Sequence, residues 1–276
     1  MGSDLSEALV RSGVGSITLI DPDTVEAHNL GRSRFDEADI GTTKVEALAA
    51  RLCRISGSVA VRPMPVATNT LDRRVLFEVI KSADVVVAAT DDGFAQALVN
   101  QLSRHAGTPA VFAGLYARAA GGEIILSREG VPCWECATAG ARTLEVPEVA
   151  RQTDYGTGRF VAEPGLISDI QFVTSAAAKL ALGLLDQATG LDQASGDDAD
   201  ADDSAAKFVE QALGTGTNYV VFGMRPGYWV FPAAMAGAAG QFALQSIWMK
   251  TEANPSCAVC GATRENPLDV VNPNAE

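Results

Sequence analysis

The chain has 276 residues, of which 47% are hydrophobic, with a formal net charge of −13 and five cysteines. This composition excludes overall disorder, and the length fits one large α/β domain or two small ones. The negative charge argues against nucleic acid as a partner, because a phosphate backbone would be repelled. No basic segment followed by an apolar stretch opens the sequence, so a signal peptide is not expected. We expect a soluble cytoplasmic protein.

Strand-length apolar runs alternate with helix-length segments through the first half of the chain. The expected elements are a helix over 3–13, a strand over 16–20, a helix over 42–55, a strand over 59–63, a helix over 72–82, a strand over 84–90, a helix over 94–105 and a strand over 109–114. The run at 84–90 is apolar throughout, which is typical of a strand covered on both faces. This alternation predicts a parallel sheet with crossover helices. Cys53 lies in an apolar turn of its helix and is expected to be buried.

The pattern changes after residue 119. A strand leads into a loop with two cysteines, a long buried helix follows over 169–186, and the acidic segment 187–207 is expected to be a loop or disordered insert. Late strands are expected in NYVVFGM and YWVF, as a hairpin around Arg225. The longest apolar stretch, 229–249, is interrupted by two glutamines and favours a packed core helix over a membrane span.

Four of the cysteines form two C-x-x-C pairs, Cys133 with Cys136 and Cys257 with Cys260. Two close pairs of thiolates supply the four tetrahedral ligands of a structural Zn²⁺ site. The alternatives are disulfides, which a cytoplasmic setting disfavours, and a redox pair, which the presence of two pairs disfavours. We predict a zinc site that pins the C-terminal segment beneath the first pair and does no chemistry.

A cluster of polar residues follows the first predicted strand, in the stretch LIDPDTVEAHNLGRSRF at 19–35. Ligands of an open parallel sheet bind outside the carboxyl ends of its strands. Asp21 stands at such an end, where an acid accepts hydrogen bonds from ribose hydroxyls. An acid that terminates a strand or caps a turn is the common alternative.

Three cations follow Asp21 in the sequence: Arg32, Arg34 and Lys44. Fixed cations are what a triphosphate requires, because phosphoryl and nucleotidyl transfer depend on positioning and charge stabilisation. An arginine fork fits phosphate oxygens, and a lysine acts as a point charge. Asp91, after the strand over 84–90, is expected to face the same crevice and to hold Mg²⁺ through oxygen ligands.

Five blocks in this order resemble the ThiF/MoeB/HesA family, the bacterial relatives of ubiquitin-activating enzymes. They are GVGSITLIDPDTVEAHNLGRSRF, DIGTTKVEALAARL, VVVAATDD, GEIILSREGVPCWEC and PSCAVCG. The resemblance implies a doubly wound, Rossmann-like, mostly parallel sheet with a zinc-pinned C-terminal extension, and usually a homodimer. It implies one adenylation domain over 1–276, with a nucleotide-binding half over 1–130 and a zinc-bound half for partner binding and dimerisation over 131–276.

The resemblance also implies an activity and assigns residues to it. MgATP adenylates the C-terminal glycine carboxylate of a small ubiquitin-like or sulfur-carrier protein, with release of pyrophosphate. Asp21 is similar to the family's ribose-binding acid, and Asn29 and Arg32 match the N-L-x-R phosphate contacts. Lys44 matches the lysine of the G-x-x-K block, and Asp91 the acid near magnesium and the α-phosphate. The four paired cysteines match the zinc ligands.

The chain departs from the family in two places. The family has a strand and a G-x-G-x-x-G turn before the first helix, of which only Gly2 and Ser3 remain. Because that strand is central and that turn supplies N–H groups to phosphates, we expect a gap in the sheet and weak ATP binding. We interpret this departure as a start codon assigned too late or a trimmed chain. The region 149–170, where many relatives carry a further cysteine, has none, which predicts adenylation without a covalent cysteine intermediate.

Two other functions stay open at this point. One is a catalytically inactive ThiF-like subunit that binds such a carrier protein or an active partner, which the shortened N-terminus favours. The other is a nicotinamide- or flavin-dependent oxidoreductase, which the same sheet architecture permits. The arginine and lysine set has no explanation in an oxidoreductase.

Overall fold

The computed structural model describes residues 1–116, 119–141, 165–189, 205–225, 244–262, 264 and 266–269. Its elements are α1 (Gly2–Arg11), β1 (Ser16–Ile20), the 3-10 helices η1 (Ala27–Arg32) and η2 (Glu37–Asp39), α2 (Lys44–Ile55), β2 (Ala60–Met64), α3 (Arg73–Lys81), β3 (Val86–Ala88), α4 (Gly93–Ala106), β4 (Ala110–Leu115), β5 (Gly121–Ser127), α5 (Trp134–Ala141), α7 (Ile167–Thr189), α8 (Ala205–Gly214), β6 (Thr217–Gly223) and β7 (Gln245–Lys250). The alternation expected for the first half is confirmed, with most ends within two residues.

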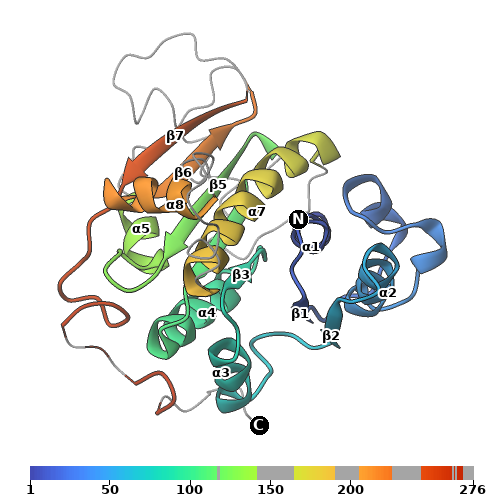
Figure 1. Ribbon diagram of the computed structural model, residues 1–276, viewed down its shortest axis with the longest axis horizontal. Coiled ribbons are helices and arrows are strands. Elements are labelled where there is room, and N and C mark those ends of the chain that lie inside the picture. The colour runs from blue at the N-terminus through green and yellow to red at the C-terminus, as the bar shows by residue number, and fades with distance from the viewer. Residues whose placement is uncertain are drawn as a thin grey trace, which may run out of the picture.

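The described strands form two sheets (Figure 1). One consists of β1 and β2, which pair in parallel, and the other has the order β3-β4-β5-β6-β7. Parallel pairing joins β3 to β4, and antiparallel pairing joins β4 to β5, β5 to β6 and β6 to β7. The antiparallel strands therefore lie in the part of the chain where the sequence pattern changes. The α/β class is confirmed.

Helices cover both faces of the larger sheet. On one face, Val111, Ile124 and Val220 pack against α7, α8 and the first helix, α1. On the other face, Phe112 and Ile125 pack against α4 and α5. Figure 1 shows α7 and α8 crossing in front of β5 and β6. The result is a three-layer sandwich with a mixed sheet in its middle layer.

The two sheets are separated between β1 and β3. These strands make no hydrogen bonds to each other, which agrees with the gap expected in the sheet. Side chains still connect them, because Ile20 of β1 and Val86 of β3 pack on one hydrophobic cluster around Leu76. β3 is only three residues long and pairs only with β4 among the described strands, and Val86 and Val87 are half-buried instead of covered on both faces.

Polar residues fix where three helices of the first half of the chain begin. Thr43 caps α2 by accepting the Glu46 N–H, and Asp72 caps α3 by accepting two backbone N–H groups. Asp92 caps α4 by accepting the Phe94 N–H at 2.8 Å. Each cap satisfies N–H groups that a helix cannot pair internally. The caps at 43 and 92 lie directly beside two candidate site residues, Lys44 and Asp91.

Three expectations need correction. Residues 245–249, expected in a helix, belong to strand β7, where exposure alternates and Ile247 and Met249 pack on the core. The acidic insert is shorter than expected, because 187–189 are in α7 and 205–207 are in α8. Cys53 is exposed, because none of the described elements buries its side of α2. The YWVF strand, the proposed hairpin turn after Arg225, and the rest of 229–249 lie outside the described residues.

In the part of the chain that the structure describes, none of the helices is long and apolar enough to cross a membrane.

A buried carboxylate in α1 makes the stability of this fold sensitive to acid. Glu7 accepts from Arg11 Nε at 2.9 Å and from Arg51 Nε at 2.7 Å, and its side chain is only 7% exposed. Burial alone would raise the pKa of Glu7, but the Arg51 and Arg11 hydrogen bonds outweigh it and lower the pKa below its usual value of 4.5. The lowered pKa means that Glu7 stabilises the fold above the unfolded-state pKa and stops doing so as the pH falls through the folded-state pKa.

We therefore predict that Glu7→Gln lowers the free energy of unfolding by about 1–3 kcal/mol at neutral pH. Urea unfolding at several pH values measures this difference, which should shrink steadily below about pH 4.5. Glu37→Gln, at an exposed acid of η2, is the control and should change little. A Glu7→Gln deficit that stays constant down to about pH 3 would contradict the prediction.

Candidate nucleotide site and metal centre

Two acids stand at the ends of the two separated sheets. Asp21 follows β1 directly, and its backbone N–H continues the pairing with β2 by donating to Met64 O at 3.3 Å. Asp91 follows β3 and precedes the cap of α4. Repulsion by Asp91 is one of the smaller effects on the Asp21 carboxylate, although the two acids follow strands of different sheets. A crevice shared by these two acids stays a prediction.

Two of the predicted cations reach the same place. Lys44, the first residue of α2, forms an ion pair with Asp23 at 2.6 Å and also attracts Asp21. Arg32, the last residue of η1, is half-buried and pairs with no described acid within ion-pair distance. Lys44 and Arg32 both act on the buried amine of Met1, at the start of α1. Arg32, Lys44 and Asp21 thus lie near the start of α1, and the N–H groups of a helix's first turn favour anions.

The charges that act on Asp21 suit a cation bound together with phosphates. Burial raises the pKa of the Asp21 carboxyl, and repulsion by Asp23 and Asp91 adds to that rise. The Asp23 backbone N–H and the charge of Lys44 act in the opposite direction. Carboxylate oxygens are suitable ligands for Mg²⁺, so the donor chemistry of Asp91 suits that ion.

Two neighbouring residues have structural roles at this edge. Asn29 is buried, 7% exposed, and its Oδ1 accepts the Glu26 N–H at 2.9 Å, which holds the 3-10 turn that carries Arg32. Asp92, the second acid of AATDD, uses one carboxylate oxygen to cap α4. Asn29 therefore has at least a positioning role in the structure. The helix-capping role belongs to Asp92 and not to Asp91.

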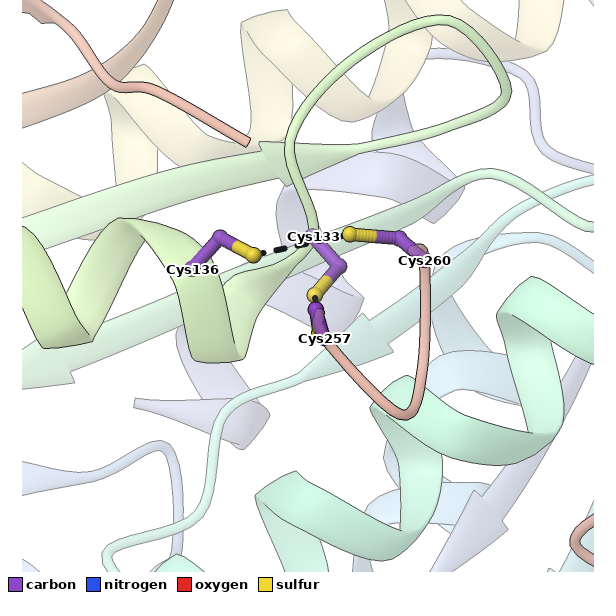
Figure 2. A group of neighbouring side chains, drawn as sticks. All are labelled: Cys133, Cys136, Cys257 and Cys260. Carbon is purple, nitrogen blue, oxygen red and sulfur yellow. Dashed lines mark hydrogen bonds between the residues drawn. The ribbon is translucent and has the colours of Figure 1, made fainter. Parts of the chain in front are cut away.

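The four paired cysteines come together at a second site (Figure 2). Their sulfur atoms all lie within 4.8 Å of one another, with Cys133 Sγ 3.7 Å from Cys257 Sγ and Cys136 Sγ 3.5 Å from Cys260 Sγ. A tetrahedral zinc–thiolate centre with bonds of about 2.3 Å has sulfur–sulfur edges of about 3.8 Å. All four thiols are free, so disulfides are excluded here. The predicted cluster is confirmed, and its geometry fits Zn²⁺.

The surroundings of the sulfurs also fit thiolate ligands. Burial raises the pKa of Cys133, and it raises the pKa of Cys136 to about 11. Burial opposes ionisation of Cys257 as well, but the backbone N–H groups of Cys260 and Val259 lower its pKa. The Asn254 N–H points at Cys136 Sγ from 3.4 Å. Such N–H donors become fully used when a metal holds the sulfurs as thiolates.

Three contacts of these sites were missed by the sequence analysis. Arg34, listed there among possible phosphate cations, instead pairs with the buried Asp4 at 2.7 Å. Asn100 and Asn218, each 0% exposed, both hold the first cysteine segment, Asn100 through the Trp134 N–H and Asn218 through Pro132 O. An asparagine in a helix or a strand carries no periodic signal. The only feature of the sequence that could have revealed Asn100 and Asn218 is a polar residue on an otherwise apolar face of a helix or strand.

One known protein family matches most of this chain. The model of the ThiF family matches residues 1–265. The chain belongs to the ThiF family.

This ThiF-family chain matches its named relatives over part of its length. It is 32% identical over 194 residues to the SAMP-activating enzyme E1 of Haloferax volcanii, which covers 70% of this chain and 66% of that protein. It is 32% identical over 138 residues to the molybdopterin-synthase adenylyltransferase of Escherichia coli, which covers 49% of this chain and 54% of that protein. The matches therefore span about two thirds and about half of these relatives.

Solved structures support the fold. The structure of Escherichia coli MccB with ATP superposes with a TM-score of 0.63 at 18% identity, over 94% of this chain and 63% of that one. This likeness confirms the Rossmann-like architecture of the ThiF-family chain.

The metal centre generates a prediction about composition. Protein purified without chelators should contain stoichiometric zinc by elemental analysis, and Cys257→Ser should lower zinc affinity by more than about 100-fold, because outer-shell changes alone cost 10–100-fold. Cys53→Ser removes an exposed thiol far from the cluster and is the matched control. Equal zinc content in the Cys257→Ser and Cys53→Ser proteins would refute the assignment.

Proposed function

We propose that this chain uses MgATP to adenylate the C-terminal carboxylate of a small ubiquitin-like or sulfur-carrier protein ending in glycine. The proposal is supported by the charges near the start of α1, where Arg32, Lys44 and Asp21 all act on the buried Met1 amine, and by the repulsion of Asp21 by Asp91. Asp21 and Asp91 come after β1 and β3, each of which pairs in parallel with a neighbouring strand. This is where nucleotides bind in open α/β sheets.

Charge compensation explains the roles of these residues. The reaction joins two anions, because a carboxylate oxygen attacks the α-phosphorus and the bond to the β-phosphate oxygen breaks, with pyrophosphate leaving. Arg32 and Lys44 neutralise the phosphates and hold them in line for attack. Asp91 is placed to hold Mg²⁺, and Asp21 to accept hydrogen bonds from the ribose hydroxyls. No general base is needed, because the attacking carboxylate is ionised at neutral pH.

The substrate class rests on relatives. The similar proteins include a SAMP-activating enzyme, a molybdopterin-synthase adenylyltransferase and a sulfur carrier protein ThiS adenylyltransferase. What these names share is adenylation or activation of a small protein. We propose the same class of partner for this chain, and a homodimer as its assembly.

Isotope exchange between ATP and pyrophosphate tests the activity directly. With a carrier protein ending in Gly-Gly, we expect exchange that falls by about 100-fold or more in Arg32→Ala and in Asp91→Ala, because each removes preorganised charge at the phosphates. Arg54→Ala and Asp84→Ala change exposed residues outside the site and are the matched controls.

Two outcomes of this assay would overturn the proposal. Carrier binding without exchange would favour an inactive, binding-only subunit. Exchange that survives in Arg32→Ala and Asp91→Ala would place the chemistry elsewhere on the chain.

The absence of cysteine from 149–170 generates a separate prediction. After incubation with ATP and carrier, we expect no thiol-reversible conjugate on this chain, because no nucleophile stands where relatives carry one. Non-reducing electrophoresis and intact-protein mass spectrometry measure this. A conjugate that dithiothreitol releases, and that persists in Cys53→Ser, would refute the prediction.

A further inference from the structure

A carboxylate held by two tyrosine hydroxyls lies near the end of strand β4. Glu123, in β5, accepts a hydrogen bond at Oε2 from Tyr116 Oη at 2.5 Å, and Tyr219 of β6 donates to the same oxygen. Two donors on one oxygen fix the direction of the carboxylate, and hydrogen bonds to a charged acceptor are roughly twice as strong as neutral ones. Glu123 is therefore held in one orientation.

The fixed carboxylate is also partly exposed. Tyr219 is 2% exposed, whereas Tyr116 and Glu123 are half-buried. A Cβ on Gly114, the β4 partner of Glu123, would lie 3.5 Å from Glu123 Oε1, so glycine at this position keeps a side chain off the carboxylate. A carboxylate has lone pairs for about four hydrogen bonds, which exceeds the two that the tyrosines donate. Glu123 can therefore accept hydrogen bonds from a ligand as well.

Glu123 lies at the edge of the sheet that also carries Asp91. Strands β3 and β4 run in parallel, with Ala88 paired to Phe112, so their carboxyl ends share one edge. Asp91 follows β3 at this edge, and Tyr116 follows β4. Neighbouring strands are only about 4.8 Å apart. The carboxylate thus belongs to the same edge as the acid proposed to hold Mg²⁺.

An exposed aromatic side chain lies at the same edge. Phe94, in the first turn of α4, is 83% exposed, the highest fraction among the exposed large hydrophobic side chains that the structure describes. Its position is fixed, because its N–H donates to Asp92 Oδ1 at 2.8 Å. Ala97, three residues on, packs in the cluster that includes Tyr116. Since residues three apart share a helix face, Phe94 lies on the side of α4 nearer Tyr116.

A fixed acceptor and an exposed ring at this edge fit a peptide chain that ends beside Asp91. Under the proposed function, the carrier's terminal carboxylate must reach the α-phosphorus there, so the residues before it pass over this edge. A glycine tail has no side chains, and backbone N–H groups are its only hydrogen-bond donors. A carboxylate accepts such donors, and an aromatic ring covers the apolar surface of the tail.

We propose that Glu123 is a binding residue for the C-terminal tail of the carrier protein, whose backbone N–H groups donate to its carboxylate while Phe94 packs against the tail. Tyr219, which is buried, is a positioning residue that acts through Glu123. The identity of the ligand rests on the proposed function. Carrier binding is therefore measured separately from ATP–pyrophosphate exchange.

Fluorescence anisotropy with a ubiquitin-like carrier ending in Gly-Gly, labelled away from its tail, measures the binding. We expect Glu123→Gln to weaken carrier affinity by about 10–100-fold, because hydrogen bonds to a charged group are worth more than neutral ones. The KM for ATP in the exchange assay should stay at its wild-type value. Glu78→Gln makes the same chemical change at an exposed acid of α3 and should bind the carrier like wild type.

Two further measurements separate tail binding from a structural role. Tyr219→Phe removes a donor to Glu123 and, being buried, changes no surface that the tail could touch. We expect it to weaken carrier affinity by about 3–10-fold, again with an unchanged KM for ATP. A carrier without its C-terminal tail should bind wild type and Glu123→Gln equally.

The assignment fails if folded Glu123→Gln and Glu78→Gln proteins bind the carrier equally well. It also fails if the deficit of Glu123→Gln persists with the tail-less carrier. Should Glu123→Gln not fold, wild-type affinity in Tyr219→Phe decides against it. Carrier binding that depends on Glu123 without any exchange would count against the proposed adenylation alone, whereas no carrier binding to wild type would overturn both proposals.

Discussion

Burial of helix α1 between the two sheets is the constraint on which the rest of the structure depends. Leu5 and Leu9 pack on the core of the five-stranded sheet, on the same face as α7. The carboxylate of Asp4 is 1% exposed, forms an ion pair with Arg34, just after η1, and accepts a hydrogen bond from Gln171 of α7. Because β1 and β3 share no hydrogen bonds, these side-chain contacts hold the sheets together. A buried ion pair contributes little net stability, but losing one partner is costly, so the pair acts mainly to fix one relative position of the sheets.

That fixed position explains how a divided sheet still presents one candidate site. Asp21 and Asp91 belong to strands that do not pair, yet their charges interact. The cations arrive from two further segments, η1 and α2, and each is held by local contacts. The Asn29 cap shapes the turn that ends in Arg32, while the Lys44 N–H donates to Asp23 O at 2.8 Å. The site therefore depends on short-range structure for orientation and on α1 for assembly.

The elements with local sequence signals were predicted correctly. The predictions failed where contacts between distant parts of the chain determine the structure. The strand at 16–20 and the capped helices were found because apolar period and cap residues are encoded within about a dozen neighbours. The strand at 245–250 was mistaken for a helix, because an apolar run of that length has no decisive period and its pairing with β6 is distant. Cys53 was placed in the core because periodicity shows which residues share a face, but not whether another layer covers it. The cysteine cluster was predictable from spacing alone, since two close pairs suit one tetrahedral ion.

Two fully buried asparagines hold the first cysteine pair in place before any metal binds. Asn218 of β6 donates to Pro132 O at 3.2 Å and accepts from Thr251 Oγ1 at 2.7 Å, so it holds the residue before the first cysteine pair beside the strand end that leads to the second. Asn100 of α4 accepts the Trp134 N–H at 3.1 Å, within the same C-x-x-C segment. Neither contact needs a metal. Because the polypeptide itself orients these cysteines, less ordering is left for the metal to bring about, and the centre costs less to form.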